Sequence, residues 1–198
     1  MKRRWALWID LTVKGALVAL LVFAVARPDL PQFHGKAMVA RALLYPIAAL
    51  IVPAWWWLSG RRRGGEYPYA LDILLVLPFL IDVAGNAANL YDTIDWWDDA
   101  NHFVNWAILV SAFGLLLVRL RVGRWEAFGL AVGFGAVTAM VWEFAEYYTF
   151  IRNSPELRTA YTDTLGDLAL GLGGSVLAAT LTVTLLWPKP SASRADAR

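Results

Sequence analysis

Six residues between positions 98 and 167 have the types and spacing of a metal site. Asp98 precedes His102 by four residues, and on a helix this spacing puts both side chains on one face. Two pairs of acids, at 143 and 146 and at 163 and 167, have similar spacings. Carboxylate oxygens with an imidazole nitrogen are ligands that Mg, Mn, Zn and Fe ions accept. The sequence therefore predicts a divalent metal site with these ligands: Asp98, His102, Glu143, Glu146, Asp163 and Asp167.

Four more residues could assist such a site, because they lie beside it in the sequence or carry charge in an apolar segment. They are Asp82, Asp95, Asp99 and Arg152. The chain has no cysteine, which excludes thiolate ligands and cysteine nucleophiles. The stretch "GLGGS" (171–175) lies inside an apolar segment with no lysine after it, so it suits close helix packing rather than phosphate binding. No organic cofactor is indicated.

Part of the acidic character has a simpler explanation. Four aspartates fall where helices are expected to begin: Asp92, Asp95, Asp98 and Asp163. Helix N-termini favour negative charge through capping and the helix dipole. Glu143 and Glu146 are expected at a helix C-terminal end, where the dipole opposes negative charge, so they need a proton, a metal ion or a cationic neighbour. Three residues could provide that cation: Arg152, Arg158 or protonated His102.

The elements that must position these residues are membrane-spanning helices. Of the 198 residues, 59% are hydrophobic and only 17% are charged, whereas soluble domains carry about 25% charged residues. The apolar stretches predict an all-α, polytopic membrane protein with six spans of about 20 residues each. The spans are expected at 7–26, 38–58, 69–90, 99–118, 125–148 and 164–187. The net charge of +2 gives no support to a nucleic-acid partner.

Basic residues predict the orientation of the spans. Lysines and arginines are more numerous in the two termini and the second and fourth loops than in the other loops, which places both termini in the cytoplasm. We expect a single transmembrane domain over 1–188 and a disordered cytoplasmic tail over 189–198. The first span follows "KRR" and ends in "AVA", as a cleavable signal peptide would, but Asp10 and Lys14 could pair on one helix face. This favours a retained helix, with cleavage the alternative.

The acids of the predicted site are expected at the same depth in the membrane. Glu143 lies 18 residues after Trp125, which is about 27 Å along a helix, close to the thickness of the hydrocarbon layer, about 30 Å. Glu143 is therefore expected near the outer border, level with His102 and Asp167. Asp82 is expected within the membrane, where an aspartate is a functional candidate by default. The alternative is a hydrogen bond from Asn86, Asn89 or a neighbouring helix.

Three motifs resemble those of a known family. "WDDANHF" (97–103), "WEFAEYY" (142–148) and "TDTLGDL" (162–168) are similar to the motifs of YjdF-like bacterial inner-membrane proteins, a family of unknown function. The resemblance covers roughly 82–178 and implies a multi-pass protein of the bacterial cytoplasmic membrane. One departure is Asn86, because some relatives have a histidine near that position. The resemblance supports the location of the site and implies no reaction.

Three functions are consistent with this pattern. The first is a metal-dependent hydrolase or transferase acting on a lipid-like or other small substrate at the outer membrane face. The second is transport of cations or protons through Asp82 and the outer acids. The third is a polar network that only fixes helix packing. The lipid bilayer is the one certain partner, and the sequence leaves the oligomeric state open.

Overall fold

The computed structural model describes residues 2–60 and 65–187, and within them the chain is helical. Six long helices are apolar and long enough to cross a membrane, which confirms the predicted six-span fold. They are α1 (Lys2–Ala26), α2 (Met38–Trp55), α3 (Tyr69–Ala87), α5 (Trp97–Leu120), α6 (Arg124–Thr149) and α7 (Ala160–Leu181). The tail predicted to be disordered, 189–198, lies outside the described residues.

Short elements complete the chain between and after these helices. A single turn, α4 (Leu90–Thr93), lies between α3 and α5, and π-helical turns η2 (Trp56–Gly60) and η6 (Thr182–Leu186) extend α2 and α7. The loops contain the 3-10 turns η1 (Pro31–Phe33), η4 (Ile151–Asn153) and η5 (Pro155–Arg158). The third span therefore ends at Ala87 rather than at 90, and the sixth begins at Ala160 rather than at 164.

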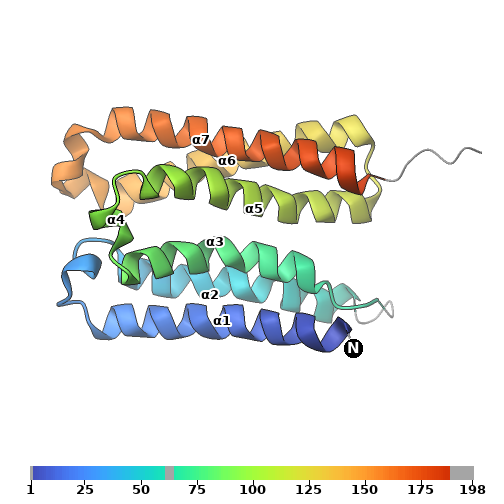
Figure 1. Cartoon of the computed structure of the whole chain (residues 1–198), viewed down its shortest axis with the longest axis horizontal. Helices are drawn as coiled ribbons and strands as arrows, with labels where there is room; N and C mark the ends of the chain where they lie inside the picture. Colours follow the sequence, from blue (N-terminus) through green and yellow to red (C-terminus); the bar gives the residue numbers. More distant parts are fainter. Residues whose placement is uncertain (1, 61–64, 188–198) are drawn as a thin grey trace, which may run out of the picture.

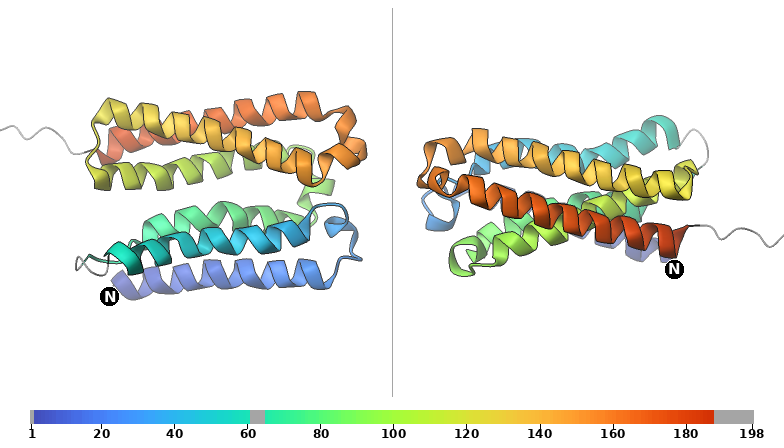
Figure 2. Two further views of the ribbon diagram at one scale, coloured as in Figure 1. Left: turned by 180° about the vertical axis from the view of Figure 1, so that it is seen from behind. Right: turned by 90° about the horizontal axis from the view of Figure 1, so that it is seen from above.

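The helices form two groups of three, α1–α3 and α5–α7, joined by α4 (Figure 1). The two groups meet mainly where α3 packs against α5. The left view of Figure 2 shows the same division from behind, so that α2 and α6, which lie at the back in Figure 1, are in front. Helix α1 begins and helix α7 ends at the same end of the bundle, as an even number of spans requires (Figure 1). That this end is cytoplasmic remains a prediction from the basic residues.

Helix α1 is an integral part of the bundle. Leu17 and Leu21 on α1 are buried in a cluster with Tyr45 of α2 and with Val76 of α3. The predicted pair of Asp10 and Lys14 also forms, with 3.3 Å between Lys14 Nζ and Asp10 Oδ2. In this fold the first span is a structural helix of the bundle, and its retention rather than cleavage stays a prediction.

Small residues bring α5 and α7 close together. A Cβ atom added to Gly174 would overlap the backbone carbonyl of Phe103, and one added to Gly171 would overlap the ring of Trp106. The expected packing role of "GLGGS" is thereby confirmed. This approach holds the start of α5, with Asp98 and His102, against the start of α7.

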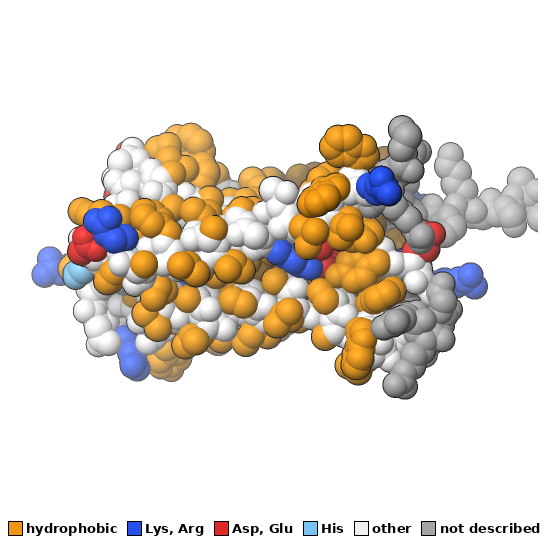
Figure 3. All heavy atoms as spheres, turned by 90° about the horizontal axis from the view of Figure 1, so that it is seen from below, with side chains coloured by type: hydrophobic (Ala, Val, Ile, Leu, Met, Phe, Trp, Pro, Cys, Tyr) orange, Lys and Arg blue, Asp and Glu red, His pale blue; other side chains and the backbone are white. Residues whose placement is uncertain are grey.

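The lateral surface of the helix bundle, the one that would face lipid, is apolar. Three leucines of α2 are among the exposed side chains: Leu43 at 70%, Leu44 at 58% and Leu50 at 63%. In Figure 3, hydrophobic side chains cover the middle of one face, and most charged side chains lie toward its two ends. The exposed belt together with the six helices identifies a multi-pass membrane protein.

Candidate functional site

His102 lies at the centre of the candidate site, one and a half turns into α5. Its side chain is 6% exposed, and each of its ring nitrogens faces acids. Nε2 lies 3.7 Å from Asp98 Oδ1 and 3.7 Å from Asp167 Oδ1. Nδ1 lies 3.7 Å from Glu143 Oε1. One imidazole is therefore flanked on both sides by carboxylates from three different helices.

Two sets of potential ligands share this histidine. Asp98, His102 and Asp167 form one set, and His102, Glu143 and Glu146 form the other, with the ligand atoms of each within 4.8 Å of one another. Ligands on opposite sides of an ion with bonds of about 2.1 Å would lie about 4.2 Å apart. Each set thus fits one ion after a small contraction.

Two carboxylates of the cluster, Glu143 and Asp167, are buried, whereas the Asp98 side chain is 48% exposed. Glu143 is 5% exposed and Asp167 is 3% exposed. In the part of the chain that the structure describes, Asp98, Glu143 and Asp167 have no lysine or arginine nitrogen within 4.0 Å. Thr164 donates a hydrogen bond of 3.1 Å from its hydroxyl to Glu143 Oε2. A hydroxyl donor orients this carboxylate but leaves its charge in place.

Arg41 of α2 is the cationic neighbour of Glu146, and the sequence reasoning missed it. Arg41 Nη2 lies 3.9 Å from Glu146 Oε1, whereas Arg152 instead lies over the ring of Tyr148, 5.6 Å from its centroid. The expectation that Arg152 might pair with the glutamates is thus not met in the structure. A signal for Arg41 was available, because an arginine inside an apolar run must find a buried partner.

Asp82 lies in a network in which both of its oxygens are occupied. Arg41 Nε donates to Oδ2 at 2.9 Å, and the Tyr45 hydroxyl donates to the same oxygen at 2.5 Å. Asn86 Nδ2 and the Tyr91 hydroxyl donate to Oδ1 at 3.3 and 3.0 Å. The alternative of hydrogen bonds from Asn86 and a neighbouring helix is therefore confirmed, whereas Asn89 makes no such bond.

Tyr91, on α4, completes this network from the loop between the spans. Burial of the Tyr91 hydroxyl, and to a smaller extent the negative charge of Asp82, raises the pKa of this hydroxyl far above its ordinary value. The hydroxyl consequently remains a hydrogen-bond donor to Asp82 at neutral pH. The network ties α2, α3 and α4 together beside the metal-ligand candidates.

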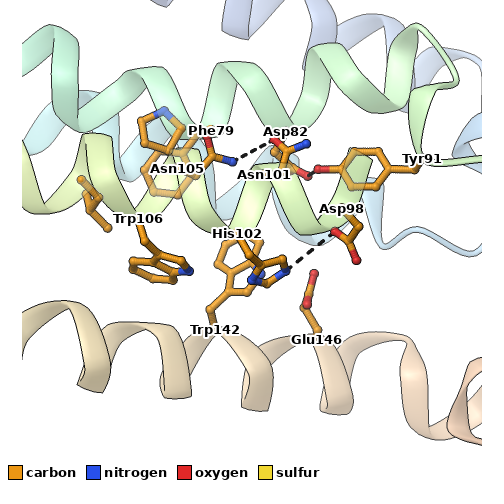
Figure 4. A pocket seen from close by; sticks show the side chains of 12 residues that line it. Phe79, Asp82, Tyr91, Asp98, Asn101, His102, Asn105, Trp106, Trp142 and Glu146 are labelled. Carbon is orange, nitrogen blue, oxygen red and sulfur yellow. Dashed lines mark hydrogen bonds and ion pairs between the residues drawn. The ribbon is translucent and has the colours of Figure 1, made fainter. Parts of the chain in front are cut away.

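A cavity of about 80 Å³ lies between the two groups of helices, next to His102. Figure 4 shows that Asp98, His102 and Glu146 line it, together with the rings of Trp106 and Trp142. Asn105 also lines the cavity, and its Oδ1 atom is buried with no hydrogen-bond partner in the described structure. At this volume the cavity could hold several water molecules or a small polar group.

The structure does not bring every predicted residue into the cluster. Asp163 lies in the first turn of α7 and is exposed, outside both ligand sets. Asp95 and Asp99 are exposed as well, and Asp99 lies in the first turn of α5. Neither α5 nor α7 has a side-chain hydrogen bond at its N-cap, so the predicted capping is absent and only the dipole explanation remains.

Asp92 is explained by an ion pair and not by capping. Lys36 Nζ, from the loop between α1 and α2, lies 2.6 Å from Asp92 Oδ1 on α4. This pair links the loop after α1 to the loop before α5. Since it is partly exposed, it contributes little to stability.

Comparison with known proteins gives a family for this architecture. A family model described as "Predicted membrane protein (DUF2238)" matches residues 9–187. The chain belongs to the DUF2238 family. The match spans all six membrane helices and bears out the resemblance to an uncharacterised membrane family. Searches of the curated proteins and of the solved structures give no match. Membership in DUF2238 therefore supplies a membrane location and no reaction.

Proposed function

We propose that this DUF2238 protein is a metal-dependent hydrolase or transferase of the bacterial cytoplasmic membrane, acting on a lipid-like substrate at the outer face. The observation that carries the proposal is His102, which has buried carboxylates beside both ring nitrogens. Buried acids without a cation are costly unless they bind a proton or a metal ion. A divalent ion would offset two of the negative charges and draw the ligand atoms together.

The better position for the ion is at Nε2 of His102, with Asp98 and Asp167. Neutral imidazole has one free lone pair, so only one of the two ligand sets can use its nitrogen at a time. The set with Glu146 lies beside the Arg41 guanidinium, which repels a second cation. With the ion at Nε2, the Nδ1–H group would face Glu143, the arrangement in which a carboxylate orients a metal-bound histidine.

The ligand oxygens suit Mg or Mn, and the imidazole is compatible with Zn or Fe. Such an ion, when bound, would supply an activated water for attack on an ester. Glu146 lines the same cavity as Asp98 and His102, so its carboxylate can accept a proton from that water. Arg41 holds Glu146 in place from the other side.

A second hollow supports a lipid-like substrate. It has a volume of about 50 Å³ between α2 and α6, and Trp142 and Glu146 line both this hollow and the cavity at His102. Its walls include Leu44, which is 58% exposed, and Phe150. Because these helices span the membrane, this side faces lipid, and an amphiphile could reach Glu146 from the bilayer.

The test is metal-dependent turnover by the purified protein in nanodiscs. The substrates would be phospholipids and polyprenyl phosphates, and the products would be read by mass spectrometry with added Mg, Mn, Zn or Fe. We expect Glu146→Gln to abolish turnover while the metal content is unchanged, and the exposed Glu156→Gln to leave both unchanged. Metal binding without turnover of any substrate would refute the enzymatic part of the proposal.

A further inference from the structure

A second buried polar cluster lies in the first group of helices, at the opposite end of the bundle, and the proposed function does not use it. Lys14 of α1 makes an ion pair with Asp72 of α3, and its Nζ atom is 3.3 Å from Asp10 Oδ2. The Asp72 side chain is fully buried and that of Asp10 is 6% exposed. The Tyr67 hydroxyl also donates a hydrogen bond to Asp72. We call Asp10, Lys14 and Asp72 the inner triad.

The inner triad repeats the pattern of the cluster around His102, which we call the outer cluster (Asp98, His102, Glu143, Glu146 and Asp167). In each group of helices, the first helix carries an aspartate followed four residues later by a basic side chain, Asp10 and Lys14 on α1 or Asp98 and His102 on α5. The third helix of each group then provides an aspartate that faces this basic side chain. These are Asp72 on α3 and Asp167 on α7.

The two groups have opposite orientations in the membrane. Each has three spans, so α5 runs antiparallel to α1, and α7 runs antiparallel to α3 (Figure 1). Asp72 and Asp98 lie in the first turns of α3 and α5, whereas Asp10 and Asp167 lie about two turns into α1 and α7. Lys14 is midway along α1, so the two clusters lie in opposite halves of the bilayer, with their aspartates toward opposite faces. Internal repeats of inverted topology are common in the folds of membrane transporters.

The inner triad has two unpartnered oxygen atoms. Asp10 Oδ1 and Asp72 Oδ1 are buried and have no hydrogen-bond partner in the described structure. Buried polar atoms are normally paired, so each such atom calls for an explanation. Two carboxylates and one ammonium group also leave one negative charge uncompensated in a buried place. One added proton would neutralise the triad and convert one of these oxygens into a hydrogen-bond donor.

We propose that Asp10, Lys14 and Asp72 form a proton-binding site near the inner membrane face, the inverted counterpart of the outer cluster. The proton comes from water at the inner face and is held by Oδ1 of one of the two aspartates. A metal ion is disfavoured as the occupant, because the Lys14 ammonium already lies between the two carboxylates. The site does not depend on metal binding at His102.

Few other titratable groups face the inner triad. In the described residues of α2, no titratable side chain lies in the inner half of the helix. Glu66 and Tyr67 precede α3, and Tyr69 packs against Tyr67 with 4.7 Å between ring centroids. Burial and the hydrogen bond to Asp72 raise the pKa of the Tyr67 hydroxyl, so this group remains protonated and does not titrate near neutral pH.

The test is the pH dependence of unfolding for the full chain in detergent, for the native protein, Asp10→Asn and the exposed control Asp29→Asn. Unfolded aspartates ionise near pH 4, so between pH 6 and 8 a proton held only by the folded state makes stability fall as pH rises. The unfolding equilibrium constant would rise up to tenfold per pH unit from this one proton. Asp10→Asn should lose that dependence, whereas Asp29→Asn should retain it.

Protons bound at the outer cluster affect the pH dependence of unfolding in all three proteins alike. The difference between the profiles of the native protein and Asp10→Asn therefore reports the proton of the inner triad alone. Parallel profiles for the native protein and Asp10→Asn would overturn the proposal, as would stabilisation by Na⁺ or Mg²⁺ that requires Asp10. If Asp10→Asn does not fold, Asp72→Asn replaces it. The infrared C=O band of a protonated carboxyl group, measured on the native protein in water and D₂O, gives a second readout, and its absence at pH 7 also overturns the proposal.

Discussion

Removing the charge of Arg41 is expected to destabilise the protein strongly. The guanidinium pairs with Asp82, and the side chains of the two residues are 11% and 7% exposed. In Arg41→Met the Asp82 carboxylate keeps only neutral donors, from Tyr45, Asn86 and Tyr91. Breaking a buried pair by removing one partner costs about 3–5 kcal/mol. For a chain of this size, 3 kcal/mol corresponds to a Tm lower by roughly 6–12 °C.

The assay is thermal unfolding in one detergent, with a double-mutant cycle. Asp82→Asn combined with Arg41→Met removes both charges, so the double variant should be clearly less destabilised than the sum of the single variants. Arg27→Met is the matched control, because Arg27 and its partner Asp29 are both exposed and its Tm should not change. Additive effects, or an unchanged Tm in Arg41→Met, would refute the inferred network.

Three further outcomes are expected. Gly174→Ala should disrupt the packing of α7 on the backbone of α5 and reduce the folded yield, whereas Gly173→Ala, with a side chain as its nearest neighbour, should not; equal yields would count against the packing. Thr164→Val removes the hydroxyl that donates to Glu143 and should weaken metal binding about 10–100-fold, as measured by titration with Mn²⁺. Unchanged affinity would count against a role of Glu143 in the site. Tyr91→Phe removes a hydrogen-bond donor to Asp82. The difference in ultraviolet absorbance between the native protein and Tyr91→Phe should show that Tyr91 stays protonated at pH 10, because its pKa is raised in the folded protein. The stability that Tyr91 contributes is then lost only in alkali, where the tyrosine of the unfolded chain ionises.

Much of the fold follows from hydropathy, because a membrane requires long apolar segments with satisfied backbones. That requirement identifies all six spans, although α4 escapes notice as a single turn between Ala87 and Trp97. Helix ends are less constrained. A span may begin in polar residues at the interface, as α7 does at Ala160.

The candidate site was only partly predictable, because helical spacing shows which residues share a face and does not show which face is buried. Asp163 and Asp167 are four residues apart, yet Asp163 is exposed and Asp167 is 3% exposed. Arg41 was missed for a related reason. Its partners Asp82 and Glu146 are far away in the sequence, and only the packing of α2 against the rest of the bundle brings them together.

The central claim is that a divalent ion binds Asp98, His102 and Asp167. The most direct measurement is the metal content of the purified protein by mass spectrometry, for the native chain, Asp167→Asn and Asp163→Asn. Both variants remove one aspartate charge from the same end of α7, but only Asp167 lies in a ligand set. We expect about one ion per chain in the native protein and in Asp163→Asn, and loss of the ion in Asp167→Asn. Absence of metal from the native protein after Mg, Mn, Zn and Fe have been supplied, or equal content in all three proteins, would contradict the claim.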